Sequence, residues 1–193
     1  MPGENKNDIA PETSELVLLI VDMISDFEFE DGEELYTPAL PAAKNLAKLK
    51  GRAREAGVPV IYVNDNFGRW RDDFKSMIEC ARASEKGREI VDLLAPDERD
   101  YYVLKPKHSG FYSTALDVLL EHLGARRLII TGLTTDICIL FTANDAYMRD
   151  YELHVPADCV AAVKPEQNEY ALEYMTRVLK TDTRESGELE MTG

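Results

Sequence analysis

The chain has 193 residues, of which 45% are hydrophobic and 30% are charged, and this fits one globular domain with a sizeable core. The formal net charge is −14, and neither Lys nor Arg gathers into a run, which argues against binding to nucleic acid or to an anionic membrane. No apolar run is long enough to cross a membrane and no signal peptide is visible, so we expect neither.

Three cysteines, Cys80, Cys138 and Cys159, are widely and irregularly spaced. They form no Cys-x-x-Cys pair, so neither a zinc site nor a disulfide framework is indicated. The pattern predicts reduced thiols in a cytoplasmic protein.

The first part of the chain predicts a loose arm followed by a strand and a helix. Residues 1–14 are polar and contain two prolines, so we expect no packed structure there. The apolar run 16–23 suits a strand buried on both faces of a parallel sheet, with Asp22 at its carboxyl end. Apolar residues at helical spacing predict a helix over 39–57, which Gly57 and Pro59 stop.

The middle of the chain repeats this order. A second strand is predicted over 58–63, and it opens into a polar and aromatic loop, 64–70. Residues 71–95 are predicted to be helical in part, with an interruption at 82–87. A third strand, 101–104, then runs directly into Lys105.

The last part contains the most informative stretch. After a predicted helix over 114–123, the apolar run 128–130 predicts a fourth strand that ends at Thr131-Gly132. A helix is expected over about 136–149, with Cys138 in its first turn. A fifth strand over 152–155, a helix over 165–180 and a frayed tail, 181–193, complete the prediction.

Because strands and helices alternate throughout, the sequence predicts a single α/β domain over 15–180. We expect a three-layer α/β/α sandwich with a parallel sheet of five or six strands, in which the strands beginning at Leu16 and Leu128 are neighbours. In such a sheet, ligands bind beyond the carboxyl ends of the strands. Asp22, Asn64-Asp65, Lys105 and Cys138 all lie at strand ends of this kind.

These residue types provide a base, a cation and a nucleophile. The positive end of a helix stabilises a thiolate, so Cys138 is the candidate nucleophile. Each residue also has a structural interpretation: Cys138 as a small buried apolar residue, Asp22 as the cap of a turn, Lys105 as a solvated charge. Their conjunction favours chemistry, because a charge that ends an apolar strand is costly to bury without a partner.

At this point the residues resemble a known family, the isochorismatase-like cysteine hydrolases, which include nicotinamidases, N-carbamoylsarcosine amidases and ureidoacrylate amidohydrolases. The resemblance covers about 16–179 and rests on three motifs. The first is Val21-Asp22-Met23 with Asp26-Phe27 just after it. The second is Lys105 followed by Ser109-Gly110-Phe111, in which Gly110 replaces the usual alanine. The third is Thr131-Gly132-Leu133-Thr134-Thr135-Asp136-Ile137-Cys138.

The resemblance implies a role for each residue and a Rossmann-like, isochorismatase-like hydrolase fold. Cys138 would attack a carbonyl carbon, Asp22 would take its proton and later activate water, and Lys105 would stabilise the thiolate and the ionised base. A cis peptide is implied between Leu133 and Thr134, so that the N–H groups of Thr134 and Cys138 form an oxyanion hole, a kind of site that contributes on the order of 3 kcal/mol per donor.

Departures from the family narrow the expected chemistry. Nicotinamidases carry metal-binding histidines after the second strand, whereas this chain has Asn64-Asp65-Asn66-Phe67-Gly68 there, so we expect no metal and no cofactor. Isochorismatase proper lacks the cysteine, so Cys138 favours hydrolysis of a C–N bond (amide, ureido or lactam) in a small molecule. The predicted substrate-binding residues are Phe27, Asn64, Phe67, Trp70 and Phe111, although aromatic residues at strand ends are also common in cores.

Other interpretations stay open. A binding or structural protein of the same fold would keep these residues without turnover. A thiol-based redox catalyst is less well supported, because no resolving cysteine lies near Cys138. The family resemblance also implies a homo-oligomer, a dimer or a tetramer, in which a neighbouring subunit could complete the pocket.

Overall fold

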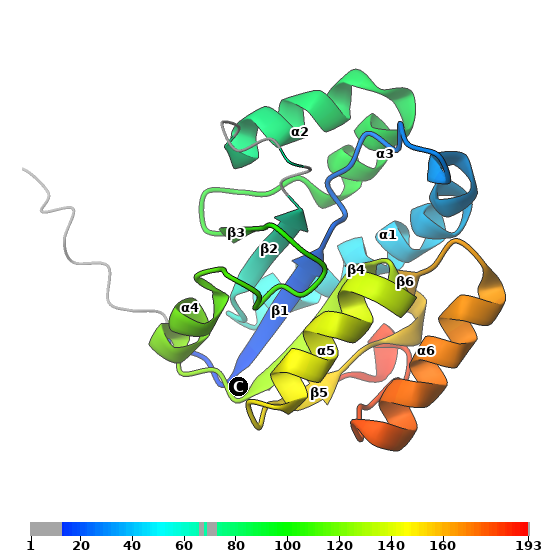
Figure 1. Cartoon of the computed structure of the whole chain (residues 1–193). Helices are drawn as coiled ribbons and strands as arrows, with labels where there is room; N and C mark the ends of the chain where they lie inside the picture. The colour runs from blue at the N-terminus through cyan, green and yellow to red at the C-terminus, as the bar shows by residue number, and fades with distance from the viewer. Residues whose placement is uncertain (1–12, 66–67, 69–72, 193) are drawn as a thin grey trace, which may run out of the picture.

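The computed structural model of the chain describes residues 13–65, 68 and 73–192. A parallel sheet lies at its centre, in the order β3-β2-β1-β4-β5, and β6 pairs with the end of β4 (Figure 1). The strands are β1 (Leu16–Val21), β2 (Val60–Asp65), β3 (Tyr101–Lys105), β4 (Arg127–Leu133), β5 (Glu152–His154) and β6 (Val160–Ala161). The predicted parallel sheet is confirmed, and β1 and β4 are neighbours, with Val17 opposite Leu128.

Helices cover both faces of the sheet, as predicted. The helices are α1 (Gly32–Glu55), α2 (Phe74–Ala83), α3 (Glu85–Leu94), α4 (Leu116–Leu123), α5 (Leu140–Tyr147) and α6 (Pro165–Val178). Apolar residues of α1, α2 and α3 form one core cluster, and those of α4, α5 and α6 form another. In Figure 1, α4 and α5 lie in front of the sheet and α1 lies behind it.

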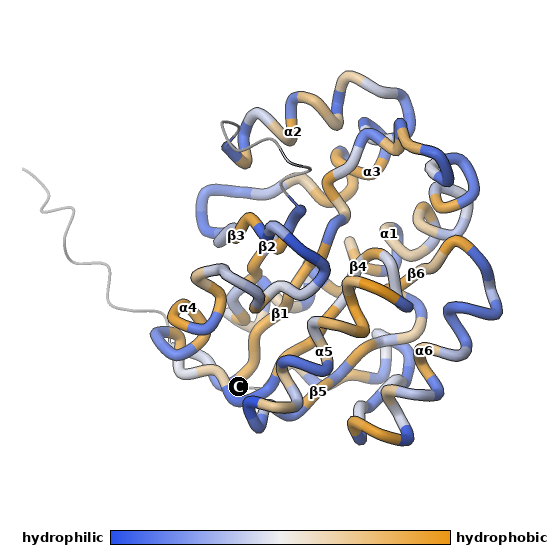
Figure 2. Tube along the Cα trace, in the orientation of Figure 1, coloured by the Kyte–Doolittle hydropathy of each residue, from blue (hydrophilic) through white to orange (hydrophobic). Residues whose placement is uncertain are grey.

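The central strand shows why the sheet needs two covering layers. Leu16, Leu18 and Ile20 belong to the cluster under α1, whereas Val17 and Leu19 belong to the cluster under α5. Successive side chains of a strand point to opposite faces, so a continuous apolar run is buried only if both faces are covered. Figure 2 shows these central strands as hydrophobic, with hydrophilic segments around them.

The first helix begins earlier than the sequence predicts. It starts at Gly32 rather than Ala39, and Pro38 and Pro41 lie inside it. Proline removes a backbone donor, which is why the pattern suggested a later start. Burial offsets this loss: Leu35 is 4% exposed, and a Cβ on Gly32 would lie 2.0 Å from the carbonyl oxygen of Phe27. The first turns of α1 therefore pack against the 22–31 segment.

The tail predicted to be frayed from residue 181 is instead packed in its described part, up to Thr192. Asp182 forms a parallel bridge with His154, and Leu189 is 6% exposed. The Ser186 N–H and hydroxyl donate to the Asp158 carboxylate, each at 2.7 Å. The apolar Leu189 and these hydrogen bonds explain why polar composition alone was misleading here. Residues 1–12 of the other predicted arm lie outside the described residues.

No helix among residues 13–65, 68 and 73–192 is long and apolar enough to cross a membrane.

Candidate active site

The carboxyl ends of β1 and β4 approach each other closely enough to require a glycine. Gly132 has φ +116°, and a Cβ there would lie 1.9 Å from the Val21 carbonyl oxygen. Asp22, the first residue after β1, has φ +52°. This left-handed conformation is uncommon outside glycine but more frequent for Asp and Asn. Asp22 Oδ1 accepts a hydrogen bond of 2.7 Å from the Asp65 N–H. The Asp22 carboxylate is therefore held at the edge of the sheet.

Lys105, the last residue of β3, reaches across to this carboxylate. Its side chain is fully buried, and its Nζ lies 2.8 Å from Asp22 Oδ2 and 3.4 Å from Cys138 Sγ. Nζ also lies 3.5 Å from Asp65 Oδ2 and donates to the Lys107 carbonyl oxygen at 3.2 Å. Strand order places the three side chains together, because β2, β1 and β4 are adjacent and β3 flanks β2.

Cys138 follows β4 in a short π-helical segment, Thr135–Ile139, which continues into α5. The sequence predicts an α-helix here, and the π-turn was missed. Such turns frequently occur at functional sites. The peptide bond between Leu133 and Thr134 is cis, as the resemblance implies.

The charges of the three groups are strongly coupled. Burial, and next the Asp22 carboxylate, raise the pKa of the Cys138 thiol to about 12, although Lys105 acts to lower it. Burial also raises the pKa of Asp22, and Lys105 limits that rise. Burial alone would lower the pKa of Lys105, but Asp22, Cys138 and Asp65 outweigh it and raise the pKa.

The helix end and Lys105 favour a thiolate at Cys138, as the sequence suggests, whereas burial and the adjacent Asp22 carboxylate favour the thiol and raise its pKa. The prediction considered the helix end and Lys105, and it left out burial and the adjacent carboxylate. Asp22, which shares the Lys105 ammonium with Cys138, is the carboxylate placed to accept the thiol proton.

A cavity of about 270 Å³ opens beside Cys138. Asp22, Asp65, Phe27, Leu133 and Thr134 line it, so Phe27 lies where the sequence predicts it. Further lining residues that sequence reasoning did not single out are Phe29, Asp31, His108, Ile137 and Val163. His108 and Ile137 are close in sequence to Lys105 and Cys138, and that spacing was the available signal for them.

The other predicted substrate-binding residues lie elsewhere. Asn64 is buried and holds the segment after β1, with its amide donating to the Ile24 carbonyl oxygen at 2.8 Å. Phe111 packs on the opposite face of the sheet, with the Arg149 guanidinium 4.6 Å from its ring centroid. Strand alternation turns Asn64 away from the cavity that Asp65 lines, whereas Phe111 lies in a turn and packs into the core cluster of α4, α5 and α6. Phe67 and Trp70 lie outside the described residues.

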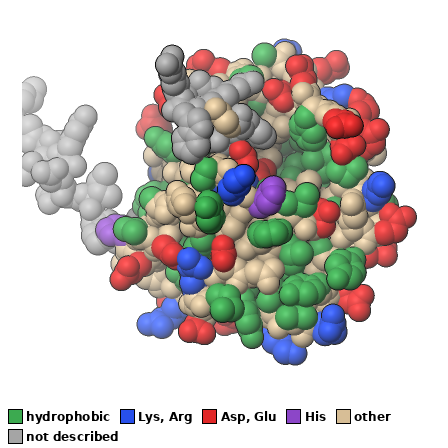
Figure 3. Space-filling model, in the orientation of Figure 1, with side chains coloured by type: hydrophobic (Ala, Val, Ile, Leu, Met, Phe, Trp, Pro, Cys, Tyr) green, Lys and Arg blue, Asp and Glu red, His purple; other side chains and the backbone are tan. Residues whose placement is uncertain are grey.

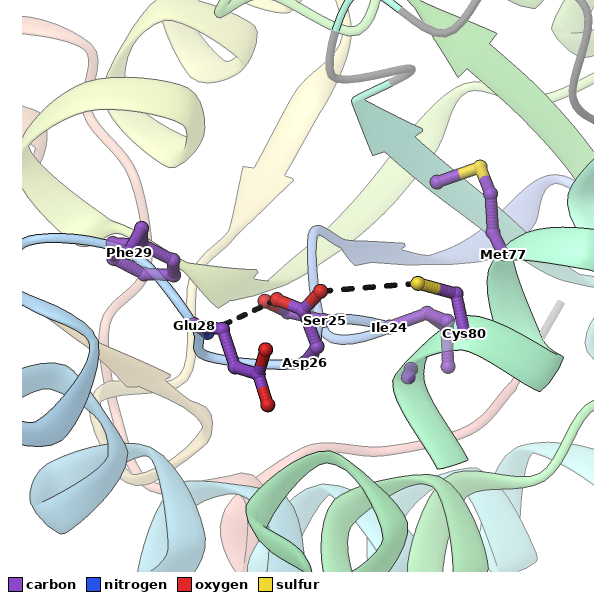
Figure 4. A pocket seen from close by; sticks show the side chains of 8 residues that line it. Ile24, Ser25, Asp26, Glu28, Phe29, Met77 and Cys80 are labelled. Carbon is purple, nitrogen blue, oxygen red and sulfur yellow. Dashed lines mark hydrogen bonds between the residues drawn. The ribbon is translucent and has the colours of Figure 1, made fainter. Parts of the chain in front are cut away.

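A second cavity, of about 190 Å³, adjoins the first, and the two share Ser25 and Phe29. Figure 4 shows the Asp26 carboxylate directed toward Cys80, whose Sγ lies 3.8 Å from Asp26 Oδ2. Asp26 Oδ1 also accepts from the Glu28 N–H at 3.0 Å. Asp26, part of the first motif, thus shapes the turn beside the cavity and lies apart from the Asp22–Lys105–Cys138 cluster.

Among the described residues, no three His, Cys, Asp or Glu side chains are grouped as a metal ion would require. Asp65, at the end of β2, lies next to the Asp22–Lys105–Cys138 cluster. Its N–H donates to Asp22, and its carboxylate approaches the Lys105 ammonium. The residues present do not match the histidine-containing metal set of nicotinamidases, and we derive no step through a metal.

The doubly covered parallel sheet is that of isochorismatase-like α/β hydrolases, and a carboxylate, an ammonium and a thiol lie at its carboxyl edge. The chain belongs to the isochorismatase family: the model described as the isochorismatase domain matches residues 16–185. It is 47% identical over 163 residues to the isochorismatase family protein YaaI of Bacillus subtilis, covering 84% of this chain and 89% of that protein.

Two further relatives differ in what their names state. The structure of N-carbamoylsarcosine amidase from Thermoplasma acidophilum has a TM-score of 0.70 and 31% identity, over 92% of this chain and 99% of that one. A protein of Arabidopsis thaliana named as a probable inactive nicotinamidase is 32% identical, over 77% of this chain and 82% of its own length. The isochorismatase family thus includes a relative named as an amidase and a relative named as probably inactive.

Proposed function

We propose that the protein is a cysteine hydrolase that cleaves an amide, ureido or lactam C–N bond of a small molecule. The observation that carries this proposal is the position of Lys105 Nζ, 2.8 Å from Asp22 Oδ2 and 3.4 Å from Cys138 Sγ, beside one cavity. A base, a nucleophile and a cation within hydrogen-bond reach are the parts that acyl transfer needs. The N-carbamoylsarcosine amidase named above supports a C–N bond as the target.

The reaction would proceed in two halves. Cys138 Sγ attacks the carbonyl carbon while its proton passes to Asp22, which avoids a free thiolate in a site that raises the thiol pKa. The C–N bond then breaks, and the proton on Asp22 moves to the leaving nitrogen. The acyl group stays on sulfur as a thioester. Asp22 next takes a proton from water, water attacks the thioester, and Cys138 leaves as the thiol.

Two backbone N–H groups are proposed to stabilise the oxyanion that forms in each half. Thr134 and Cys138 both line the cavity, and their N–H groups are the proposed donors. Each donor of this kind contributes on the order of 3 kcal/mol to lowering the barrier. Lys105 adds a fixed positive charge next to both Asp22 and Cys138. Phe27 is proposed as a wall for the substrate.

A silent, ligand-binding member of the same fold is the second candidate. It is favoured by the Arabidopsis relative described as probably inactive. The experiment that separates the two is a panel of primary amides, ureido acids and lactams, assayed for released ammonia or a new carboxylate. Release that disappears in Cys138→Ser supports the hydrolase. Binding of a panel compound without any release would support the silent member.

We also propose that the protein is cytoplasmic and forms homo-oligomers, a dimer or a tetramer. None of the three described cysteines forms a disulfide, which suits a reducing compartment. Exposed apolar side chains lie on α5 and directly after it: Phe141 is 52% exposed, and Met148, the residue that follows the helix, is 77% exposed. Figure 3 shows hydrophobic side chains gathered on the lower part of the face it draws. Light scattering of the wild type and of Met148→Lys would test association through this face.

A further inference from the structure

The helix that follows Cys138 contacts the loop that follows Lys105 at two further points. Thr142 and Asp145 come four and seven residues after Cys138, a spacing that places side chains on one face of a helix. Cys138 Sγ contacts Lys105, and the Thr142 hydroxyl oxygen accepts from the Gly110 N–H at 3.0 Å. Asp145 Oδ2 accepts from the Ser109 hydroxyl at 2.5 Å. All three side chains therefore face the segment from Lys105 to Gly110.

The loop is buried and closely fitted at these contacts. Ser109 is 5% exposed and Thr142 is fully buried. The Ser109 hydroxyl oxygen also accepts from the Phe111 N–H at 3.1 Å. A Cβ on Gly110 would lie 2.9 Å from Val63 Cγ1 and 3.2 Å from Leu116 Cδ2. Gly110, in place of the alanine that the family usually has, lets this loop lie close to β2 and α4.

The loop in turn supplies one of the acceptors of Lys105. Lys105 Nζ donates to the Lys107 carbonyl oxygen at 3.2 Å, and Lys107 lies two residues before Ser109. A shift of Ser109 away from α5 would therefore move an acceptor that holds the ammonium between Asp22 and Cys138. Displacements of about 1 Å near reacting groups can cost about 100-fold in rate.

We propose that Asp145, with Ser109 and Thr142, positions Lys105 relative to Cys138 by holding the 107–111 loop against the helix that carries the thiol. The inference rests on the proposed function, because it assigns these residues a role only through Lys105 and Cys138. Asp145 touches no reacting group itself. It is a positioning residue. The helical segment carries the thiol at its start, and through Thr142 and Asp145 it also holds the loop that contacts the Lys105 ammonium.

The role has an electrostatic signature that packing alone would not produce. Lys105 acts to lower the pKa of both Asp22 and Cys138, so an ammonium that retreats lets both pKa values rise. Alkylation follows the thiolate fraction, so the acid limb of the Cys138 profile would move to higher pH, by roughly half to one unit for a retreat of about 1 Å.

The experiment measures the rate of iodoacetamide modification of Cys138 against pH, read by mass spectrometry of its peptide. Asp145→Ala and Ser109→Ala are expected to move the acid limb upward and to slow modification severalfold. Their double variant should shift it no further, because both changes remove the same hydrogen bond. Asp145→Asn keeps an acceptor for Ser109 and should behave as the wild type. Thr142→Val removes the acceptor of the Gly110 N–H, and it replaces Asp145→Ala in this test if that variant does not fold.

Two controls separate the loop contact from other effects. Asp117→Asn removes the carboxylate that the Arg149 guanidinium holds at 2.8 Å and leaves Ser109 untouched, so its profile should not move. His108 is adjacent to Ser109 and lines the cavity. The profiles of the wild type and of Asp145→Ala are therefore measured again with His108→Gln added to each. The titratable groups around Cys138 among the described residues are Asp22, Asp31, Asp65, Lys105 and His108.

The outcomes distinguish this inference from the proposed function. An acid limb that is normal in the wild type and unmoved in both Asp145→Ala and Thr142→Val would overturn the positioning role alone. A wild-type protein that releases no product from any amide, ureido acid or lactam of the panel would overturn the proposed function, whereas the alkylation profiles would still decide whether the loop contact positions Lys105.

Discussion

Two lysines of this chain are buried beside a carboxylate, one within a core and one at the ligand edge of the sheet. Lys50, on α1, is 3% exposed, and its Nζ lies 3.0 Å from Asp100 Oδ2. It also donates to the Tyr62 hydroxyl at 2.5 Å and to the Ala95 carbonyl oxygen at 2.8 Å. An ammonium has three N–H donors, so each donor of Lys50 has one partner.

Lys105 has more partners than donors. Its Nζ is within 3.5 Å of two carboxylates, one carbonyl oxygen and the Cys138 thiol. The consequence is an opposite direction of the pKa shift: burial lowers the pKa of Lys50 despite Asp100, whereas the surrounding acceptors outweigh burial and raise the pKa of Lys105. A closed set of hydrogen bonds serves stability, whereas the proposed mechanism uses a cation that several acceptors share beside a cavity.

The largest expected effect tests whether the thiol at the ligand edge is a nucleophile. Cys138→Ser should lose several powers of ten in turnover once a substrate is known, because an essential nucleophile is gone. The free energy of unfolding should fall by less than about 1.5 kcal/mol, because the volume hardly changes. Cys80→Ser, outside the cluster, is the matched control. If Cys138→Ser kept more than about a tenth of wild-type turnover, attack by water activated by Asp22 would be the better account.

The second prediction contrasts the two lysines directly. Lys105→Met should lower turnover by about 10²–10³-fold, since it removes the fixed positive charge next to the reacting groups. Lys50→Met should leave turnover per folded molecule unchanged and lower the free energy of unfolding by about 3 kcal/mol. That value is at the low end for a broken buried pair because Arg54 still lies 2.8 Å from Asp100. Urea unfolding and steady-state kinetics of both variants provide the measurements.

The contrast between the two lysines would be contradicted if Lys105→Met and Lys50→Met had the same effects on turnover and on stability. Equal losses of turnover at unchanged stability would show that burial beside a carboxylate, and not position at the sheet edge, decides the role.

The third prediction concerns the thiol itself. Burial and the Asp22 charge raise the pKa of Cys138 to about 12, so Asp22→Asn, which removes the charge and keeps the shape, should lower that pKa by about one unit or more. The sign follows because a negative neighbour disfavours a thiolate. Thiolate should therefore appear at lower pH in Asp22→Asn than in the wild type, although turnover is lost with the base. Ultraviolet absorbance of the thiolate against pH measures this shift, and a thiol pKa that stayed in place or rose would contradict it.

The sequence predicts the positions of the three clustered side chains better than their surroundings. Asp22, Lys105 and Cys138 follow apolar runs, and parallel strands bring such ends to one edge whatever the loops do. The segment after β1 depends on positive φ at Asp22 and Phe27, which no spacing rule predicts. The interior position of Asn64 and the packing of Phe111 under Arg149 likewise depend on contacts between distant segments. The raised thiol pKa needs the burial of the whole cluster, which sequence does not measure.

The smallest expected effect distinguishes two neighbouring lysines, Lys105 at the end of β3 and Lys107 in the loop that follows. Lys107 is exposed, and the contact it makes with Lys105 uses its backbone carbonyl oxygen, which every residue has. Lys107→Ala should therefore change turnover by less than about twofold, because surface substitutions rarely cost more than about 0.5 kcal/mol. Lys107→Pro would alter the backbone and is not an equivalent test. Steady-state kinetics of Lys107→Ala beside Lys105→Met decide the assignment: a large loss in the first with an intact second would move the functional ammonium from the end of β3 to the loop.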